Sequence, residues 1–342
     1  MIGTPIRSLL DGRDLSRSDM HEIFCAVMDN GVSDVQKTAL LVALRMKGET
    51  AGEITGAAEA MRERVIPLEV DAERVIDTCG TGGDGKGTIN VSTLAALVAA
   101  GAGIPVAKHG NRAVSSSCGS ADVLAALGVN IDLDAAAMAA VLKEIGVSFL
   151  FAPKLHPAMA AVAPIRRELA VRTIFNVLGP LTNPARARRQ VLGVYSPKLV
   201  PLIGEVLLAL GAEHALVVHS DDGLDEISPA AATEVCEVTA SGGVKRYRIE
   251  PEEIGIERAA PDAIGGGDAA TNAAIARRVL EGEKGAAREA VVANAGAAIY
   301  VGGSVGSIRE GVAVARESID SGKAMRKLEE LIEATNATPS RA

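Results

Sequence analysis

Two glycine-rich polar loops hold the side chains of this chain that are best suited to chemistry. The first loop, at residues 77–93, reads DTCGTGGDGKGTINVST, and the second, at residues 108–122, reads KHGNRAVSSSCGSAD. Glycine lets a backbone approach a ligand closely, and free N–H groups at the start of a helix attract anions. The two loops therefore predict one binding site for a phosphorylated substrate.

Cationic side chains are available to such a substrate in the second loop and further along the chain. Lys108 and Arg112 lie in the loop, and Arg166 and Arg167 follow on a later helical stretch. Arginine suits bidentate recognition of a carboxylate, although surface arginines are also common without any ligand. His109 is compatible with a role as an acid or base and equally with a structural hydrogen bond.

A pair of adjacent carboxylates, Asp225 and Glu226, follows the apolar run at residues 215–219. Mg²⁺ is usually bound through one or two carboxylates together with substrate phosphate. Taken alone, the pair also fits a solvated acidic turn. Together with two phosphate-type loops, it predicts a magnesium site.

Two further patterns point to other nucleotide sites but lack the required context. Residues 80–85 fit G-x-G-x-x-G, yet the next strand ends in Lys108 rather than in the acidic residue that would hold a dinucleotide ribose. Residues 216–223, LVVHSDDG, are similar to the acidic strand end of the commonest phosphoribosyltransferase fold, but LDEI follows instead of a phosphate-binding turn.

Composition restricts the class of protein. The 342 residues carry a net charge of −8, and only 2% of them are aromatic, which disfavours binding to nucleic acid or to an anionic membrane. The four cysteines are far apart and form no C-x-x-C pair, so we expect reduced thiols and no zinc site. The start of the chain has no signal-peptide pattern, and we expect a cytoplasmic enzyme.

Helices in the first seventy residues are expected to lead into an α/β unit. Ser18, Ser33 and Thr50 precede apolar residues at helical spacing, and Thr50 with Glu53 forms a capping-box pattern. Strands are predicted at residues 74–77, 105–108, 148–152, 190–194, 215–219, 233–238 and 244–249. Helical stretches alternate with the first of these strands, which is typical of a parallel sheet.

These elements predict two domains. Residues 1–70 form a small helical domain, to which a turn-rich segment at about 156–185 returns. Residues 71–155 and 186–335 form a larger α/β domain with a mostly parallel central sheet, helical again from Asn272 onward. Residues 336–342 are expected to be a frayed tail.

With these residues assembled, the chain closely resembles the anthranilate phosphoribosyltransferases, which belong to the nucleoside-phosphorylase-like phosphoribosyltransferases. The resemblance covers almost the whole length. It rests on GTGGDG at Gly80, NVST at Asn90, KHGNRAVSS at Lys108, GSADVLAALG at Gly119, APIRREL at Ala163, FNVLGPLTNP at Phe175, GLDEIS at Gly223 and GGGDAATNA at Gly265.

The resemblance implies a helical domain hinged to an α/β domain, with the active site between them, and a homodimer formed through the helical part. It assigns Mg²⁺ to Ser92, Asp225 and Glu226, and anthranilate to Gly80, Asn111 and Arg166. The residues that it assigns to phosphoribosyl diphosphate (PRPP) are Gly80, Gly83, Asp84, Thr88, Asn90, Val91, Ser92, Thr93, Lys108, His109, Gly110, Asn111, Arg112, Ser115, Ser116 and Ser120.

The implied reaction transfers the phosphoribosyl group of PRPP to the amine of anthranilate. We expect no covalent nucleophile, with Lys108 stabilising the leaving diphosphate electrostatically. Ser117 and Cys118 depart from the family pattern, because many relatives carry a basic residue after the paired serines. A pyrimidine nucleoside phosphorylase and a non-catalytic nucleic-acid-binding relative remain alternatives.

Overall fold

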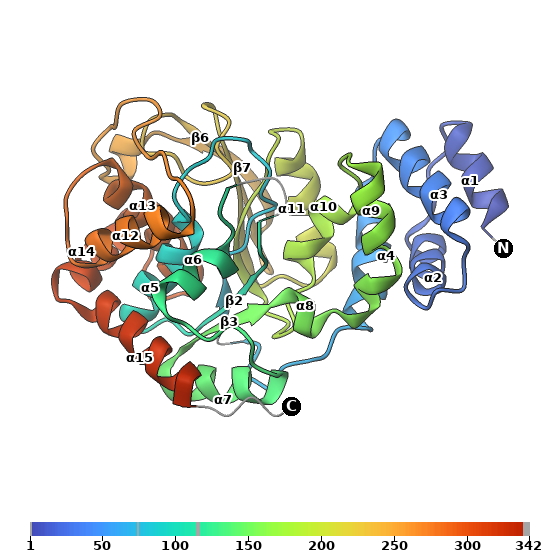
Figure 1. The fold of residues 1–342 in the computed structure, drawn as a ribbon. Coiled ribbons are helices and arrows are strands. Elements are labelled where there is room, and N and C mark those ends of the chain that lie inside the picture. The colour runs from blue at the N-terminus through green and yellow to red at the C-terminus, as the bar shows by residue number, and fades with distance from the viewer. Residues whose placement is uncertain (1, 74, 114–116, 338–342) are drawn as a thin grey trace.

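The computed structural model describes residues 2–73, 75–113 and 117–337. Figure 1 shows a small group of N-terminal helices beside a larger body built on one sheet. The helical group comprises α1 (Gly3–Leu10), α2 (Arg17–Met28), α3 (Asp34–Lys47) and α4 (Ala51–Arg62). No helix in the described residues is long and apolar enough to cross a membrane.

Side-chain caps fix where these helices begin. Thr50 and Glu53 form the predicted capping box of α4, and Ser33 caps α3 as its position indicates. The cap of α2 was expected near Ser18, but the structure places it at Ser16, which forms a capping box with Asp19. The first turn of α2 therefore starts two residues earlier, because only Ser16 has an acidic residue three positions later.

The sheet has seven strands in the order β3-β2-β1-β4-β5-β6-β7. The pairs from β3 to β5 are parallel, and β6 and β7 are antiparallel, so the predicted mostly parallel sheet is confirmed. The strands are β1 (Ile76–Asp77), β2 (Val106–Gly110), β3 (Val147–Phe151), β4 (Arg189–Gly193), β5 (His214–Ser220), β6 (Thr233–Thr239) and β7 (Gly243–Ile249).

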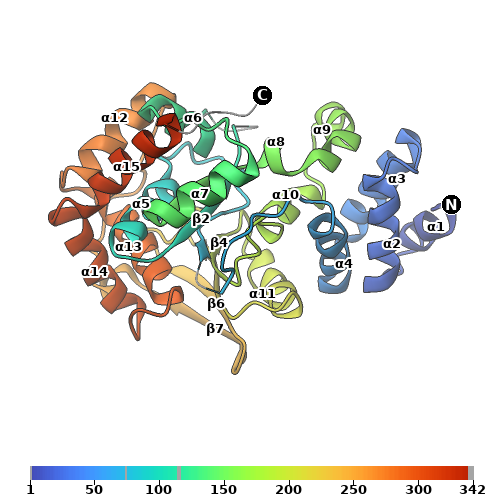
Figure 2. The ribbon, with the colours of Figure 1, turned by 90° about the horizontal axis from the view of Figure 1, so that it is seen from below.

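Both faces of the sheet are covered by helices. One face packs against α5 (Val91–Gly101), α6 (Ser120–Leu127), α7 (Ala135–Ile145), α12 (Ala269–Leu280), α13 (Ala286–Val301), α14 (Ile308–Asp320) and α15 (Lys323–Ala337). The other face packs against α11 (Leu199–Ala209) and is continuous with the core of the helical group (Figure 2). Asn336 and Ala337 belong to α15, so the helix continues into the predicted tail.

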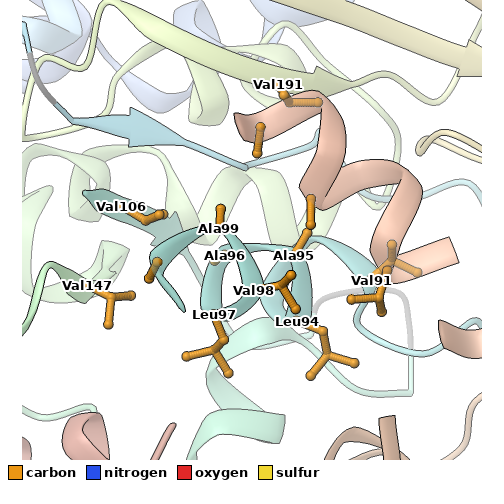
Figure 3. Close-up of a cluster of buried hydrophobic side chains, with 14 of the residues drawn as sticks. Val91, Leu94, Ala95, Ala96, Leu97, Val98, Ala99, Val106, Val147 and Val191 are labelled. Carbon is orange, nitrogen blue, oxygen red and sulfur yellow. The ribbon is translucent and has the colours of Figure 1, made fainter. Parts of the chain in front are cut away.

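Successive side chains of a strand point to opposite faces of the sheet and so belong to two different hydrophobic cores. In β5, Leu216 and Val218 face the larger core, whereas Ala215 and Val217 face the core shared with the helical group. Figure 3 shows α5 buried in the larger core, where its side chains meet valines of the sheet. This apolar helix starts at the end of the first glycine loop, and its burial fixes the loop at the sheet edge.

The segment between β3 and β4 lies against the helical group. It contains α8 (Ala152–Leu155), α9 (Ala163–Leu169) and α10 (Phe175–Leu178). The Phe175 ring packs 5.6 Å from that of Phe24 on α2, and Lys37 Nζ of α3 donates a 3.0 Å hydrogen bond to Ala161 O. These contacts hold the segment between β3 and β4 against helices α2 and α3.

Candidate active site

Three loops meet at the carboxyl ends of β1, β4 and β5. A Cβ atom on Gly193, the last residue of β4, would overlap the carbonyl oxygen of Asp225, so only glycine lets the loop after β5 cross this strand end. A Cβ atom on Gly80 would lie 3.3 Å from Asp225 Oδ2. The acidic pair therefore lies against the first glycine loop, although the sequence separates them widely.

The predicted metal-binding residues Ser92, Asp225 and Glu226 converge here. The backbone N–H of Ser92 donates a 3.2 Å hydrogen bond to Glu226 Oε1. Burial raises the pKa of Glu226 to about 7, opposed by the Lys108 cation. Burial, with repulsion from Glu226 and Asp84, raises the pKa of Asp225 well above its ordinary value. The carboxylates of Asp225 and Glu226 thus carry more negative charge than the nearby cation balances. Such oxygen donors are a suitable ligand set for Mg²⁺.

Lys108 supplies a buried cation beside these carboxylates. Its side chain is 4% exposed, and Nζ donates hydrogen bonds of 2.6 Å to Thr78 O and 3.2 Å to Ser92 Oγ. The ammonium group thus joins the end of β2 to the loop after β1 and to the first turn of α5. Such a position suits an anion held at the start of that helix.

The first glycine loop ends in the N-terminal turn of α5. Val91, Ser92 and Thr93 are the first three residues of this helix, and Thr93 Oγ1 is buried with no hydrogen-bond partner among the described residues. Thr88 pairs with Gly265, and the Asn90 side chain donates to Cys118 O and accepts from Asn272. Thr88 and Asn90 therefore fix the loop to its neighbours.

Further toward the loop tip, the glycines adopt left-handed backbone. Gly83 has a φ of +79°, which a side chain would disfavour. Asp84 accepts a 3.0 Å hydrogen bond from Lys86 N and lies within hydrogen-bonding reach of Asp225. The loop thus folds back toward the acidic pair.

The second glycine loop is closed by one carboxylate. Asp122 accepts hydrogen bonds of 2.9 Å from Ala113 N, Gly119 N and Arg112 Nη1. Arg112, which was assigned to PRPP, is thus engaged in an ion pair within its own loop. The carbonyl of Asn111 accepts from Ser120 Oγ at 3.2 Å.

Other predicted residues of this loop are held tightly or lie outside the described chain. A Cβ atom on Gly110 would overlap Ser120 Oγ, so the loop turns closely over the start of α6. Ser115 and Ser116 lie outside the described residues. Ser117 and Cys118, the expected departure from the family pattern, attach the loop to its surroundings: Ser117 Oγ donates to Gly267 O at 2.9 Å, and Cys118 is buried.

The His109 side chain is buried and lies against a second histidine. Its Nε2 atom lies 3.1 Å from Nε2 of His156, and its backbone N–H donates to Asp77 Oδ1 at 3.1 Å. Burial lowers the pKa of His109 to about 3 and that of His156 to about 4. Both rings are therefore neutral near pH 7, with one nitrogen donating and the other accepting.

We expect this pair to make stability pH-dependent. Unfolded histidines have a pKa of about 6.5, so the unfolded chain binds more protons below that pH and stability falls as pH drops toward 4. Two such groups correspond to a loss of about 2–3 kcal/mol between about pH 7.5 and 5.5. Between these pH values, the free energy of urea unfolding should fall by this much more in the wild type than in the H109N/H156N variant. Asp77 and Glu226, whose pKa values burial raises to about 6 and to about 7, titrate in both proteins, so their contributions cancel in the comparison.

An equal pH slope in the two proteins would contradict this account of the pair. The absolute stability of the variant does not enter the comparison, because only the change between the two pH values is measured. Far-UV circular dichroism at the higher pH checks that both proteins start folded.

Arg166 lies on α9, half-buried, with its guanidinium carbon 5.4 Å from the centre of the Phe175 ring. Burial lowers the pKa of its guanidinium. Its neighbour Arg167 is exposed. No hydrogen bond or ion pair joins the Arg166 side chain to either glycine loop in the part of the chain that the structure describes.

Arg172 was not singled out from the sequence, yet it links the segment before α10 to the first loop. Its Nη2 atom donates to Gly83 O, and its guanidinium carbon lies 4.1 Å from the centre of the Tyr195 ring. Tyr195 N in turn donates to Thr81 Oγ1 at 3.1 Å. Only its place just before FNVLGPLTNP could have drawn attention to it.

Comparison with known proteins agrees with this architecture. Residues 72–325 match the family described as glycosyl transferase family, a/b domain, and residues 5–65 match its helical bundle domain. Anthranilate phosphoribosyltransferase of Anaeromyxobacter dehalogenans strain 2CP-C is 56% identical over 335 residues, 98% of this chain and 99% of that protein. The chain belongs to the anthranilate phosphoribosyltransferase family.

Solved structures of the family agree in fold. The crystal structure of anthranilate phosphoribosyltransferase from Thermus thermophilus matches with a TM-score of 0.92 and 47% identity, covering 97% of this chain and 99% of that one. The Saccharomyces cerevisiae enzyme in complex with PRPP and Mg matches with a TM-score of 0.88 and 29% identity, covering 97% of each chain. The predicted family and fold class are confirmed.

Proposed function

We propose that the chain transfers the phosphoribosyl group of PRPP to the amine of anthranilate, giving N-(5-phosphoribosyl)anthranilate and diphosphate in tryptophan biosynthesis. The observation that carries this proposal is the meeting of Lys108, the start of α5 and the pair Asp225 and Glu226 at one sheet edge. The full-length similarity to anthranilate phosphoribosyltransferases supports it.

The first substrate is assigned to the two glycine loops. PRPP would contact Gly80, Gly83, Asp84, Thr88, Asn90, Val91, Ser92, Thr93, Lys108, His109, Gly110, Asn111, Arg112, Ser115, Ser116 and Ser120. The Thr93 hydroxyl, which has no partner in the described part of the chain, and the buried Lys108 ammonium support this assignment most directly. We expect less from Arg112, because Asp122 already pairs with it.

Asp225, Glu226 and Ser92 would hold Mg²⁺, which would neutralise charge on the diphosphate. The raised pKa values of the two carboxylates support this assignment, since a divalent cation would relieve their repulsion. The relative from Saccharomyces cerevisiae was crystallised with PRPP and Mg.

The chain's own groups would act by position and charge. Breaking the bond between the ribose carbon and diphosphate builds negative charge on the leaving group, which Lys108 and the N–H groups of α5 are placed to stabilise. The aromatic amine of anthranilate is uncharged near neutral pH, so no strong base is needed. Arg166 would pair with its carboxylate, with Gly80 and Asn111 also contacting this substrate.

The direct test is an assay with anthranilate, PRPP and Mg²⁺ that follows the loss of anthranilate fluorescence. Turnover that requires all three components is the expected result. Well-folded protein without turnover would reject the proposal, and phosphorolysis of thymidine or uridine would favour a pyrimidine nucleoside phosphorylase instead.

The R166A variant should lose binding of anthranilate selectively. The charge-assisted bond to a carboxylate is worth about 1.5–3 kcal/mol, so KM for anthranilate should rise roughly 10- to 100-fold while KM for PRPP changes little. R167A is the matched control, because Arg167 is the exposed neighbour on the same helix. Equal changes in the two KM values would assign Arg166 to the diphosphate or to the fold.

We further propose a homodimer formed through the helical group. Leu10 on α1 and Val35 and Met46 on α3 are 68%, 80% and 80% exposed, which is unusual for large apolar side chains. Helices α1 and α3 pack on each other, so these side chains lie on neighbouring elements. A cytoplasmic location is proposed from the sequence pattern alone.

A further inference from the structure

A cluster of three metal-ligating side chains lies on the helical group, away from the site described above. His21 and Cys25 are four residues apart on α2, so their side chains share one face of the helix. Glu63 caps the C-terminus of α4 and reaches the same point. Single ligand atoms of the three residues all lie within 4.8 Å of one another.

Close packing of α2 on α4 brings the three together. A Cβ atom on Gly56 would overlap Arg17 O, so glycine on α4 permits the backbones to approach. His21 Nε2 lies 2.8 Å from Glu63 Oε1, and Cys25 Sγ lies 3.8 Å from His21 Nε2 and 3.9 Å from Glu63 Oε2.

These separations are near those around one tetrahedral zinc ion. Bonds of about 2.3 Å to sulfur and about 2.0 Å to nitrogen or oxygen place neighbouring ligand atoms roughly 3.3–3.6 Å apart. The two contacts of Glu63 use different carboxylate oxygens, so one oxygen would serve both neighbours, and three ligand atoms that lie within 4.8 Å of one another would close to this spacing. A thiol, an imidazole and a carboxylate form a ligand set for a borderline-soft ion, in contrast to the oxygen-only set at Asp225 and Glu226.

The fourth coordination position is open to solvent. His21 and Glu63 line a cavity of about 840 Å³, which Glu22 also lines. Arg64 Nη1 lies 3.2 Å from Cys25 Sγ, but two hydrogen bonds of 2.6 and 2.7 Å to Asp29 hold and neutralise this guanidinium. Burial raises the pKa of the Cys25 thiol, and the Arg64 guanidinium opposes this rise, so a metal ion would bind here with release of the thiol proton.

We propose that His21, Cys25 and Glu63 form a second metal site, which takes Zn²⁺ or a similar thiophilic divalent ion and joins α2 to the end of α4. The spacing of the cysteines did not predict this site, because its two other ligands are a histidine one helical turn earlier and a carboxylate from another helix.

The test uses the full chain, freed of metal with a chelator and supplied with excess Mg²⁺ to occupy the hard-ligand site. Cobalt(II) titration should give a thiolate-to-cobalt charge-transfer band at one equivalent, and Zn²⁺ should abolish it by displacement. Competition against a chromophoric chelator then gives the Kd for Zn²⁺.

Three variants are compared with the wild type. C25S should lose the charge-transfer band, and both C25S and H21Q should bind Zn²⁺ at least about tenfold more weakly. E22Q is the matched control, because Glu22 is an exposed carboxylate of the same helix and cavity but is not in the cluster, and its Kd should not change. Circular dichroism checks the fold, and H21Q decides the test if C25S does not fold.

Two results would overturn the proposal. A charge-transfer band that survives C25S would place the metal at another thiol, such as Cys79 near Asp225. A wild type that binds Zn²⁺ no better than H21Q would mean that His21 and Glu63 form an ion pair only.

Discussion

Replacing Asp225 with Asn and Glu226 with Gln should lower kcat by at least two orders of magnitude while the protein remains folded. Removing a principal stabiliser of transition-state charge costs about 3 kcal/mol or more in the barrier. Steady-state assays over a Mg²⁺ titration measure the loss. D221N is the matched control, because Asp221 lies in the same loop after β5 and is exposed in an ion pair with Arg248.

The stability of this double variant separates a catalytic role from a structural one. Burial raises the pKa of both carboxylates, and repulsion from Glu226 adds to the rise at Asp225, so their ionised forms cost folding free energy at neutral pH. Without Mg²⁺, the neutral variant should unfold at the same or a higher urea concentration than the wild type. Unchanged turnover at every Mg²⁺ concentration would remove the metal assignment, and a large loss of stability would make the pair structural.

The K108M variant should show the second-largest effect, a rise of about 2–4 kcal/mol in the barrier for phosphoribosyl transfer. Methionine keeps most of the volume of the lysine but removes the ammonium group that bonds Thr78 O and Ser92 Oγ. The loss should appear mainly in kcat, because the charge on the leaving group develops in the transition state. K86M, at an exposed lysine of the first loop, is the control.

The pH profile of K108M gives an independent readout. The Lys108 cation lowers the pKa of Glu226, which burial otherwise raises to about 7. Without that cation, Glu226 should hold its proton to higher pH, and the rise of activity with pH should shift upward. Loss of activity with an unchanged profile would show that Lys108 does not act next to Glu226.

The sequence by itself determined the local elements and the types of groups in the site. Capping at Ser33 and Thr50, the alternation of strands and helices, and the two glycine loops are encoded in short stretches of chain, because caps and turns need only neighbouring residues. The adjacent carboxylates Asp225 and Glu226 were likewise recognisable as a pair. The resemblance to the anthranilate phosphoribosyltransferases then suggested the two substrates, PRPP and anthranilate.

Tertiary structure decided which of these groups meet. Gly193 lets Asp225 cross the end of β4, His109 meets a histidine 47 residues away, and Arg112 pairs within its own loop instead of remaining free. Arg172 contacts Gly83 only because the segment between β3 and β4 folds against the first glycine loop. Such contacts depend on strand order and on close packing, which a one-dimensional pattern does not contain, because residues remote in sequence become neighbours only when the whole core has formed.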